Sequence, residues 1–246
     1  MKISIIGDIL YCMESEQQIL VLRNKVLECL KGKVNDFALG GGTALSLFYF
    51  RHRESYDLDF FANVFSDRRI EEVIEELSRS VGQKVSLLSK NRAQNQAKIT
   101  MYEVSGGLKI DFIEDLFRHF DNKTIVNQIP ILSKESIYLR KVYAACGIEE
   151  TLSDTGRTEF VGGRQEAKDY FDLYYLSSVF MPLSKFVEDF CDQSEKERVI
   201  IWHSRYDRMR MKTGLLDIRT NSVLDTKIME KHFDSEIQKL IEKEMN

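Results

Sequence analysis

The segment GGGTALSLFYFRHRESYDLDFF, residues 40–61, constrains the fold more than any other part of this chain. A short apolar run at 36–39 leads directly into the glycines, and Thr43 is placed to N-cap a helix at 44–50. Glycine lets a backbone approach a ligand closely, and the N–H groups at a helix N-terminus favour phosphate. The order of strand, glycine turn and helix therefore predicts an α/β arrangement with a place for an anion.

The glycine turn belongs to neither of two common phosphate-binding loops. No GK[ST] follows the glycines, which excludes a Walker A loop. The GxGxxG spacing of dinucleotide-binding folds is also missing. The turn by itself is therefore weak evidence for a particular ligand.

Two carboxylates follow the turn at the start of an apolar run. Asp57 and Asp59 are separated by one residue, so in a strand their side chains share one face. Mg²⁺ prefers hard oxygen ligands and often takes one or two carboxylates together with substrate phosphates. The alternative is a solvated strand edge with Leu58 and Phe60 directed inward, and the pair alone does not decide between the two.

A third acid, Asp111, lies in a predicted β-hairpin. The runs 98–104 and 108–113 flank Ser105-Gly106-Gly107, which is a strong turn signal. Three acids on neighbouring strands would form the carboxylate cluster of a phosphoryl-transfer site, and one of them would serve as the base. The alternative is an outward polar position that shares a face with Lys109.

The remaining pattern predicts two domains. Further helices are expected at 14–30, 67–82 (N-capped by Asp67), 133–146 and 164–179, further strands at 57–61 and 84–88, and a polar loop at 147–163. Beyond Pro182 the chain is predicted to be mostly helical. We therefore expect a mixed α/β domain at 1–130 and a helical domain at 131–246.

Composition narrows the class of protein. Apolar residues make up 43% and charged residues 30% of the 246 residues, which is typical of an ordered globular chain. A net charge of −4 argues against a uniformly basic nucleic-acid coat. The four cysteines have no zinc spacing and no apolar run approaches the length of a membrane span, so we expect reduced thiols, a cytoplasmic protein and no membrane partner.

Five blocks make the resemblance to a known family specific. In order they are GGTAL, HRESYDLDFF, KIDFI, RKVYAACG and GRQEAKDYFDLYYL, spread over roughly residues 35–180. Together they resemble the AbiEii/AbiGii-type nucleotidyltransferases, toxins of bacterial abortive-infection and toxin–antitoxin systems. The resemblance implies an α+β fold: a polymerase-β-like nucleotidyltransferase core with a mixed β-sheet (1–130), and a helical C-terminal module (131–246) that contributes to the active-site cleft.

The resemblance also assigns residues by position. The phosphate-binding turn corresponds to Gly41, Gly42 and Thr43. The metal ligands correspond to Asp57, Asp59 and Asp111. The lysine and the acid of the later blocks correspond to Lys141 and Asp169, with Asp172 beside the latter. Two departures stand out, namely Thr43 where a serine is common, and a loop at 148–163 that is longer than expected.

The helical half offers further charged candidates for the site. Lys141 would neutralise a triphosphate as a point charge, with Asp169 orienting it or contacting the acceptor and Arg164 as an additional phosphate ligand. In the alternative, Lys141 is a solvated lysine, and Lys168, Asp169 and Asp172 are helix-surface residues joined by ordinary i,i+3 and i,i+4 contacts.

The acceptor side is less constrained by the sequence. Residues 198–219 carry basic residues interleaved with Trp202 and Tyr206, a pattern that suits single-stranded RNA or a tRNA end. The favoured alternative is an amphipathic helix with both aromatic side chains in the core. Arg51, His52 and Arg53 are expected either at the mouth of the site or in a solvated basic loop.

The sequence thus leads to one main hypothesis. The chain is a Mg²⁺- or Mn²⁺-dependent nucleotidyltransferase that moves a nucleotidyl group from an NTP to a hydroxyl, with RNA or tRNA as the acceptor. The resemblance implies the toxin of a phage-defence system, with a cognate antitoxin protein as partner. The alternatives are an enzyme acting on a protein or an aminoglycoside-like small molecule, and a catalytically silent NTP-binding regulator.

Overall fold

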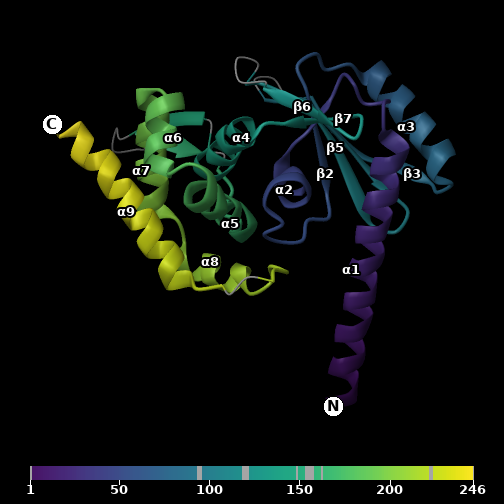
Figure 1. Ribbon diagram of the computed structural model, residues 1–246, viewed down its shortest axis with the longest axis horizontal. Coiled ribbons are helices and arrows are strands. Elements are labelled where there is room, and N and C mark those ends of the chain that lie inside the picture. Colours follow the sequence, from purple (N-terminus) through teal and green to yellow (C-terminus); the bar gives the residue numbers. More distant parts are fainter. Residues whose placement is uncertain are drawn as a thin grey trace. The chain divides into compact units, whose positions relative to one another are not determined.

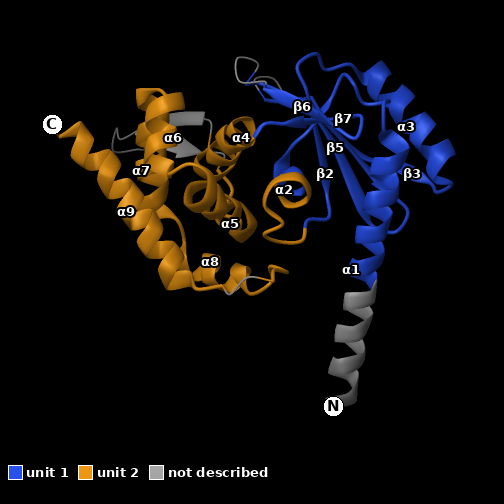
Figure 2. Ribbon diagram, in the orientation of Figure 1, with its two compact units in different colours: residues 1–44, 55–133 blue, residues 45–54, 134–246 orange. Residues whose placement is uncertain are grey.

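The computed structural model describes residues 2–92, 96–117, 122–147, 149–152, 158–161, 163–221 and 224–245. The chain divides into two compact units (Figure 2). Unit 1 contains residues 1–44 and 55–133, and unit 2 contains residues 45–54 and 134–246. The sequence placed the boundary at 130/131 and assigned residues 45–54 to the first domain. The structure groups that short segment with the helices.

Unit 1 is built around a seven-stranded sheet. Its helices are α1 (Lys2–Leu30), α2 (Gly41–Ala44) and α3 (Asp67–Val81). Its strands are β1 (Ala38–Leu39), β2 (Leu58–Ala62), β3 (Val85–Asn91), β4 (Ile99–Val104), β5 (Leu108–Glu114), β6 (Lys123–Val126) and β7 (Ile129–Leu132). The strand order is β3-β4-β5-β2-β1-β7-β6.

The sheet is mixed, as the predicted α+β class requires. β2 runs parallel to β5 and β1 runs parallel to β7, while the other neighbouring strands pair antiparallel. The expected hairpin is confirmed, because β4 and β5 pair across the Ser105-Gly106-Gly107 turn. Strands β6 and β7 were not predicted. They occupy residues 123–132, to which the sequence analysis assigned no element, and β7 joins the sheet through its pairing with β1.

One face of the sheet carries the core of unit 1. Leu58, Phe60, Ile110 and Phe112 alternate with more exposed residues along β2 and β5 and are fully buried. Helices α1 and α3 pack against each other, and Figure 1 shows them on one side of the sheet with α2 on the other. The half-buried residues between these apolar positions therefore face the side of the sheet where α2 begins.

Helix α3 follows the sequence signals closely. It ends near Gly82, as predicted, and Gly82 is its C-cap in the left-handed conformation. The predicted N-cap was wrong by one residue, because Ser66 and not Asp67 accepts the hydrogen bond from the Arg69 N–H. Asp67 is the first helical residue, where its charge favours the positive end of the helix dipole.

The helix after the glycine turn starts earlier than expected. It begins at Gly41, so the prediction that Thr43 caps a helix starting at Ala44 was wrong. Thr43 lies inside the first turn, and its hydroxyl donates to the carbonyl of Asp57 instead of to its own helix. The helix continues into unit 2 as a π-helical segment, η1 (Leu45–Phe50).

Unit 2 is helical, with one small sheet. Its other helices are α4 (Lys134–Cys146), α5 (Ala167–Tyr175), the π-helical η3 (Leu176–Phe180), α6 (Leu183–Phe190), α7 (Gln193–Arg205), α8 (Arg208–Leu215) and α9 (Thr226–Glu244). The predicted loop at 147–163 was wrong in part, because β8 (Glu149–Leu152) and β9 (Thr158–Val161) pair antiparallel within it. Residues 148, 153–157 and 162 of that loop lie outside the described residues.

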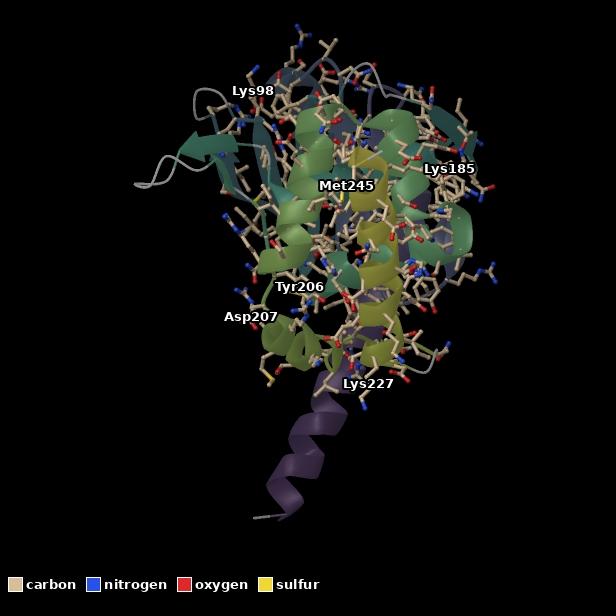
Figure 3. The ribbon with its side chains drawn as sticks, turned by 90° about the vertical axis from the view of Figure 1, so that its left-hand side faces the viewer. Lys98, Lys185, Tyr206, Asp207, Lys227 and Met245 are labelled. Atoms are coloured by element: carbon tan, nitrogen blue, oxygen red, sulfur yellow. The ribbon has the colours of Figure 1, made fainter. Side chains whose placement is uncertain are left out.

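An aromatic cluster forms much of the core of unit 2. Tyr170, Trp202, Tyr206 and Phe233 contact one another, and each is buried. Figure 3 shows Tyr206 beside Asp207, at the point where α7 gives way to α8. The favoured alternative, in which Trp202 and Tyr206 lie in the core, is confirmed by the burial of both rings.

Two further observations bear on the class of protein. None of the described helices combines the length and apolarity needed to cross a membrane. Among the cysteines whose side chains the structure describes, Cys29, Cys146 and Cys191 are free thiols.

Candidate active site

Two of the three predicted metal ligands lie side by side in unit 1. Asp59 on β2 and Asp111 on β5 are direct partners in the parallel pairing of these strands. Paired residues on neighbouring strands project to the same face, and the strands are separated by about 4.8 Å. Both side chains are half-buried. The structure therefore brings together two carboxylates that are 52 positions apart in the numbering of the sequence.

The glycine turn lies directly against Asp59, one member of this carboxylate pair. Gly41 has φ = +62°, and a Cβ atom built on it would lie 2.0 Å from Oδ2 of Asp59. The Gly40 N–H donates to the carbonyl of Asp59 at 2.9 Å. Only glycine combines this left-handed backbone with so close an approach. The first N–H groups of α2 therefore start beside the acids, as a phosphate-binding turn requires.

Thr43 and Ser55 contact each other at the two ends of residues 45–54, the segment that separates the two stretches of unit 1. The two hydroxyl oxygens lie 2.9 Å apart, and Thr43 also donates to the carbonyl of Asp57. Asp57 is half-buried and precedes β2 by one residue. The hydroxyl kept by Thr43 thus has a local structural role, since it fixes the backbone that carries Asp57.

Carboxylate oxygens such as those of Asp59 and Asp111 are the type of ligand that Mg²⁺ prefers. Within the described ranges, no group of three or more His, Cys, Asp or Glu side chains is arranged to hold a metal ion. Mg²⁺ often uses only one or two carboxylates and completes its shell with water and phosphate. Asp59 and Asp111 meet that requirement by their pairing, and Asp57 is the remaining predicted ligand.

The predicted residues of the second half gather in unit 2. The Lys141 Nζ lies 2.7 Å from Oδ1 of Asp169 and 2.6 Å from Oδ2 of Asp172. Asp169 also forms an ion pair with Arg164, whose Nε is 2.8 Å from its Oδ2. The helix-surface alternative for Asp169 and Asp172 was therefore wrong, because both carboxylates are fully buried. Lys168, the residue before Asp169, is exposed and approaches Glu166.

Sequence reasoning missed two partners of Asp172. Arg53 donates from Nε to Oδ1 at 2.6 Å and from Nη2 to Oδ2 at 2.8 Å, which is a bidentate pair. His52 Nε2 lies 2.7 Å from Oδ1 and donates to it, because an ionised carboxylate only accepts. The solvated-loop interpretation of His52 and Arg53 was wrong, since both are buried, whereas Arg51 is exposed.

These pairings decide the protonation states of the network. Burial on its own would raise the pKa of Asp172, but Arg53 and Lys141 outweigh it and hold that pKa well below its usual value. Burial likewise opposes ionisation of Asp169, and Lys141 and Arg164 more than offset it, so that its pKa is lowered. Burial would lower the pKa of Lys141, but the two carboxylates raise it. All three groups are therefore charged at neutral pH.

Most of the chain matches one family model. The model is described as nucleotidyl transferase AbiEii toxin, type IV toxin–antitoxin system, and it matches residues 25–245. This chain belongs to the AbiEii nucleotidyltransferase toxin family. The expectation drawn from the five sequence blocks is thereby confirmed, and the match extends it from roughly residues 35–180 to nearly the whole chain.

Solved structures show the same fold at low sequence identity. JHP933 from Helicobacter pylori is 17% identical, with a TM-score of 0.54 over 94% of this chain and 93% of that chain. MenT4, a nucleotidyltransferase toxin from Mycobacterium tuberculosis, is 15% identical, with a TM-score of 0.51 over 92% of this chain and 84% of that chain. No curated protein sequence matches the chain.

The family membership gives the AbiEii chain its enzyme class. It is a nucleotidyltransferase and a toxin of a toxin–antitoxin system, which implies an antitoxin partner. The Asp59–Asp111 pair beside Gly41 is its candidate nucleotide site in unit 1. The ion-pair network around Lys141 is the candidate charged site in unit 2.

Proposed function

We propose that this AbiEii protein transfers a nucleotidyl group from an NTP to a hydroxyl on RNA, with a tRNA 3′ end as the favoured acceptor, in a reaction that depends on Mg²⁺ or Mn²⁺. The observation that carries the proposal is the direct pairing of Asp59 with Asp111 against the Gly41 turn. Carboxylates and phosphate-binding N–H groups are the two donor types that a metal-bound triphosphate needs.

The residues of the chain have separate tasks in this reaction. The N–H groups of Gly41, Gly42 and Thr43 orient the β- and γ-phosphates. Asp57, Asp59 and Asp111 would hold the metal ion, which would neutralise the charge that develops on the phosphoryl oxygens. Asp111 would also accept the proton of the attacking hydroxyl. In such transfers most of the rate comes from positioning and from stabilisation of charge.

Unit 2 supplies the remaining charge in this proposal. Lys141 offsets negative charge on the triphosphate, and Arg164 is a second phosphate ligand. Asp169 fixes the Lys141 ammonium, as its 2.7 Å contact supports.

The family description, a toxin of a type IV toxin–antitoxin system, supports a proposal about the cellular role. We propose that the protein acts in phage defence and that a cognate antitoxin restrains it. RNA is favoured as the acceptor because modification of tRNA would stop translation, which is a direct route to toxicity. An acceptor on a protein or a small molecule would use the same donor chemistry, since a fold does not choose the acceptor.

A labelling experiment separates these acceptors. The protein is incubated with each α-labelled NTP, Mg²⁺ and total tRNA, and the products are resolved by size. We expect label on tRNA that is lost with a chelator, is restored by Mg²⁺ or Mn²⁺, and is absent with Asp59→Asn. The Glu114→Gln variant, with a change on the same strand as Asp111, is the matched control and should label normally.

The other outcomes are equally informative. Label on the protein itself, on added cellular protein or on an aminoglycoside would replace RNA as the acceptor and leave the donor chemistry intact. NTP binding without transfer to any acceptor would favour the regulatory alternative and would remove the enzyme proposal for this chain.

A further inference from the structure

Two buried residues, His52 and Arg53, have no role in the chemistry described above. They lie in residues 45–54, the connection between the glycine turn and Asp57. This connection clusters with the helices of unit 2 although both of its neighbouring stretches belong to unit 1. Specific contacts therefore hold residues 45–54 to the helices of unit 2.

The segment is fixed at several points within unit 2. Arg53 and His52 both bind the carboxylate of Asp172. The hydroxyl of Thr220 donates to the carbonyl of His52 at 2.6 Å, and the Glu54 N–H donates to the carbonyl of Arg219 at 2.8 Å. These hydrogen bonds involve both the side chains and the backbone of residues 52–54, so they fix the backbone of the segment as well as its side chains.

The backbone of the segment is unusual over most of its length. Residues 45–50 form a π-helix, and Arg51 has φ = +53° although it is not a glycine. π-Helical turns and left-handed non-glycine residues persist only where surrounding contacts enforce them, and they occur frequently at functional sites. The pairing of Arg53 and His52 with Asp172 lies directly after this strained stretch and supplies such an enforcing contact.

Stability alone does not account for the network. Ionised groups lose their hydration when they are buried, and buried ion pairs can often be replaced by apolar side chains without loss of stability. What apolar packing cannot reproduce is the fixed angle of a bidentate guanidinium–carboxylate pair. Both carboxylate oxygens of Asp172 accept hydrogen bonds from Arg53, and Oδ2 also forms an ion pair with Lys141.

We propose that Asp172 is a positioning residue that joins residues 45–54 to Lys141. Its carboxylate holds the Arg53 guanidinium and the Lys141 ammonium in one geometry, so the segment leaving the glycine turn and the lysine cannot shift independently. Asp172 itself touches no substrate. The proposal rests on the proposed function only in so far as Lys141 meets the triphosphate.

The main test compares Asp172→Asn with Glu236→Gln. Glu236 is also a buried carboxylate of unit 2, bound to Ser184 and Lys239, and it is outside the network. We expect Asp172→Asn to lower kcat roughly 10- to 100-fold, as small displacements of a catalytic group do, with a smaller change in KM for the NTP. Glu236→Gln should keep its kcat even where it lowers thermal stability.

Two further variants distinguish positioning from general damage. Arg53→Lys keeps the charge and removes the two-point geometry, so it should lower kcat in a protein that still folds. In a Lys141→Met background, Asp172→Asn should add less than about a twofold further loss, because residues that act as a unit are not additive. Full additivity of the two substitutions would overturn the proposal.

A readout besides activity completes the test. Hydrogen exchange of the amides in residues 45–54 should be at least about fivefold faster in Asp172→Asn or Arg53→Lys than in wild type, and unchanged in Glu236→Gln. Unchanged exchange, or a kcat within twofold of wild type for both folded variants, would overturn the proposal. If wild type transfers nothing, the proposed function fails, while the exchange comparison still decides whether Asp172 fixes the segment.

Discussion

The two pairs of acids in this protein occupy opposite environments. Asp59 and Asp111 are half-buried on neighbouring parallel strands of unit 1. Asp169 and Asp172 are fully buried in unit 2, and each lies within 2.8 Å of two side-chain cations. The side chains of the first pair are partly exposed. The second pair is matched by the chain's own lysine and arginines.

The largest expected effect is a contrast between the two pairs of acids: substitution of Asp59 should lower activity, and substitution of Asp169 should lower stability. Asp59→Asn should lower kcat/KM by at least about 1,000-fold, equivalent to about 4 kcal/mol of transition-state stabilisation, while the free energy of unfolding changes by no more than about 1 kcal/mol. Asp169→Asn should lower the free energy of unfolding by about 3–5 kcal/mol, because Lys141 and Arg164 lose a buried partner.

Urea denaturation and initial-rate measurements on both variants test this contrast. Asp111→Asn should behave like Asp59→Asn, since the two positions are paired. A strongly destabilised Asp59→Asn would show that unit 1 uses its acids to maintain the fold, and the contrast between the two units would then be lost.

A smaller effect is expected at the glycine turn. Gly41→Ala combines a strained left-handed residue with a Cβ atom 2.0 Å from the Asp59 carboxylate, so the acid must move and activity should fall roughly 10- to 100-fold. Gly82→Ala is the matched control. It has the same type of backbone, at φ = +66°, and nothing lies within 4 Å of its added Cβ.

The control isolates the cost of strain. Gly82→Ala should lose about 1–2 kcal/mol of unfolding free energy with normal activity. Equal activity in the two alanine variants would mean that the close approach of Gly41 to Asp59 has no bearing on the reaction.

The smallest effect concerns acid pH and the buried pair. An unfolded aspartate has a pKa of about 3.9, and the folded-state pKa values of Asp169 and Asp172 lie below their usual value. The stability that they contribute is therefore present above about pH 4 and is lost as the pH falls through their folded pKa values. Asp172→Asn should be less stable than wild type at pH 7, and this gap should narrow by about 1 kcal/mol at pH 3.

Urea denaturation at the two pH values measures the gap. A gap that stays constant would show that Asp172 binds protons equally in the folded and unfolded states, contrary to its pairing with Arg53 and Lys141. Glu114→Gln, a change at a half-buried strand residue of unit 1, provides the reference for substitutions outside the network.

The sequence predicted local structure well where local signals were complete. The β4–β5 hairpin and α3 have their turn and capping residues within a few positions, so their existence followed from the sequence alone. The strands β6 and β7 were missed because β7 depends on its pairing with β1, about 90 residues earlier in the chain. The β8–β9 pair was missed because its polar composition resembles that of a loop.

The candidate site divides in the same way. The sequence named Asp59, Asp111, Lys141 and Asp169 from motifs, and the structure pairs the first two and the last two. It did not identify Arg53 or His52 as partners of Asp172, because nothing local joins residues 119 and 120 positions apart. The one available signal was the run of basic residues before the DxD motif, which suits a solvated loop equally well.

The sequence by itself determined the chemistry that this protein carries. A glycine turn, spaced carboxylates and a lysine-containing helix are fixed by residue type and order, and they were sufficient to point to the AbiEii family. Only the tertiary structure decided which of these charged residues lie beside one another. That choice depends on non-local pairing: the parallel register of β2 with β5 sets Asp59 beside Asp111, and burial of Asp172 makes its ionisation depend on cations from distant parts of the chain.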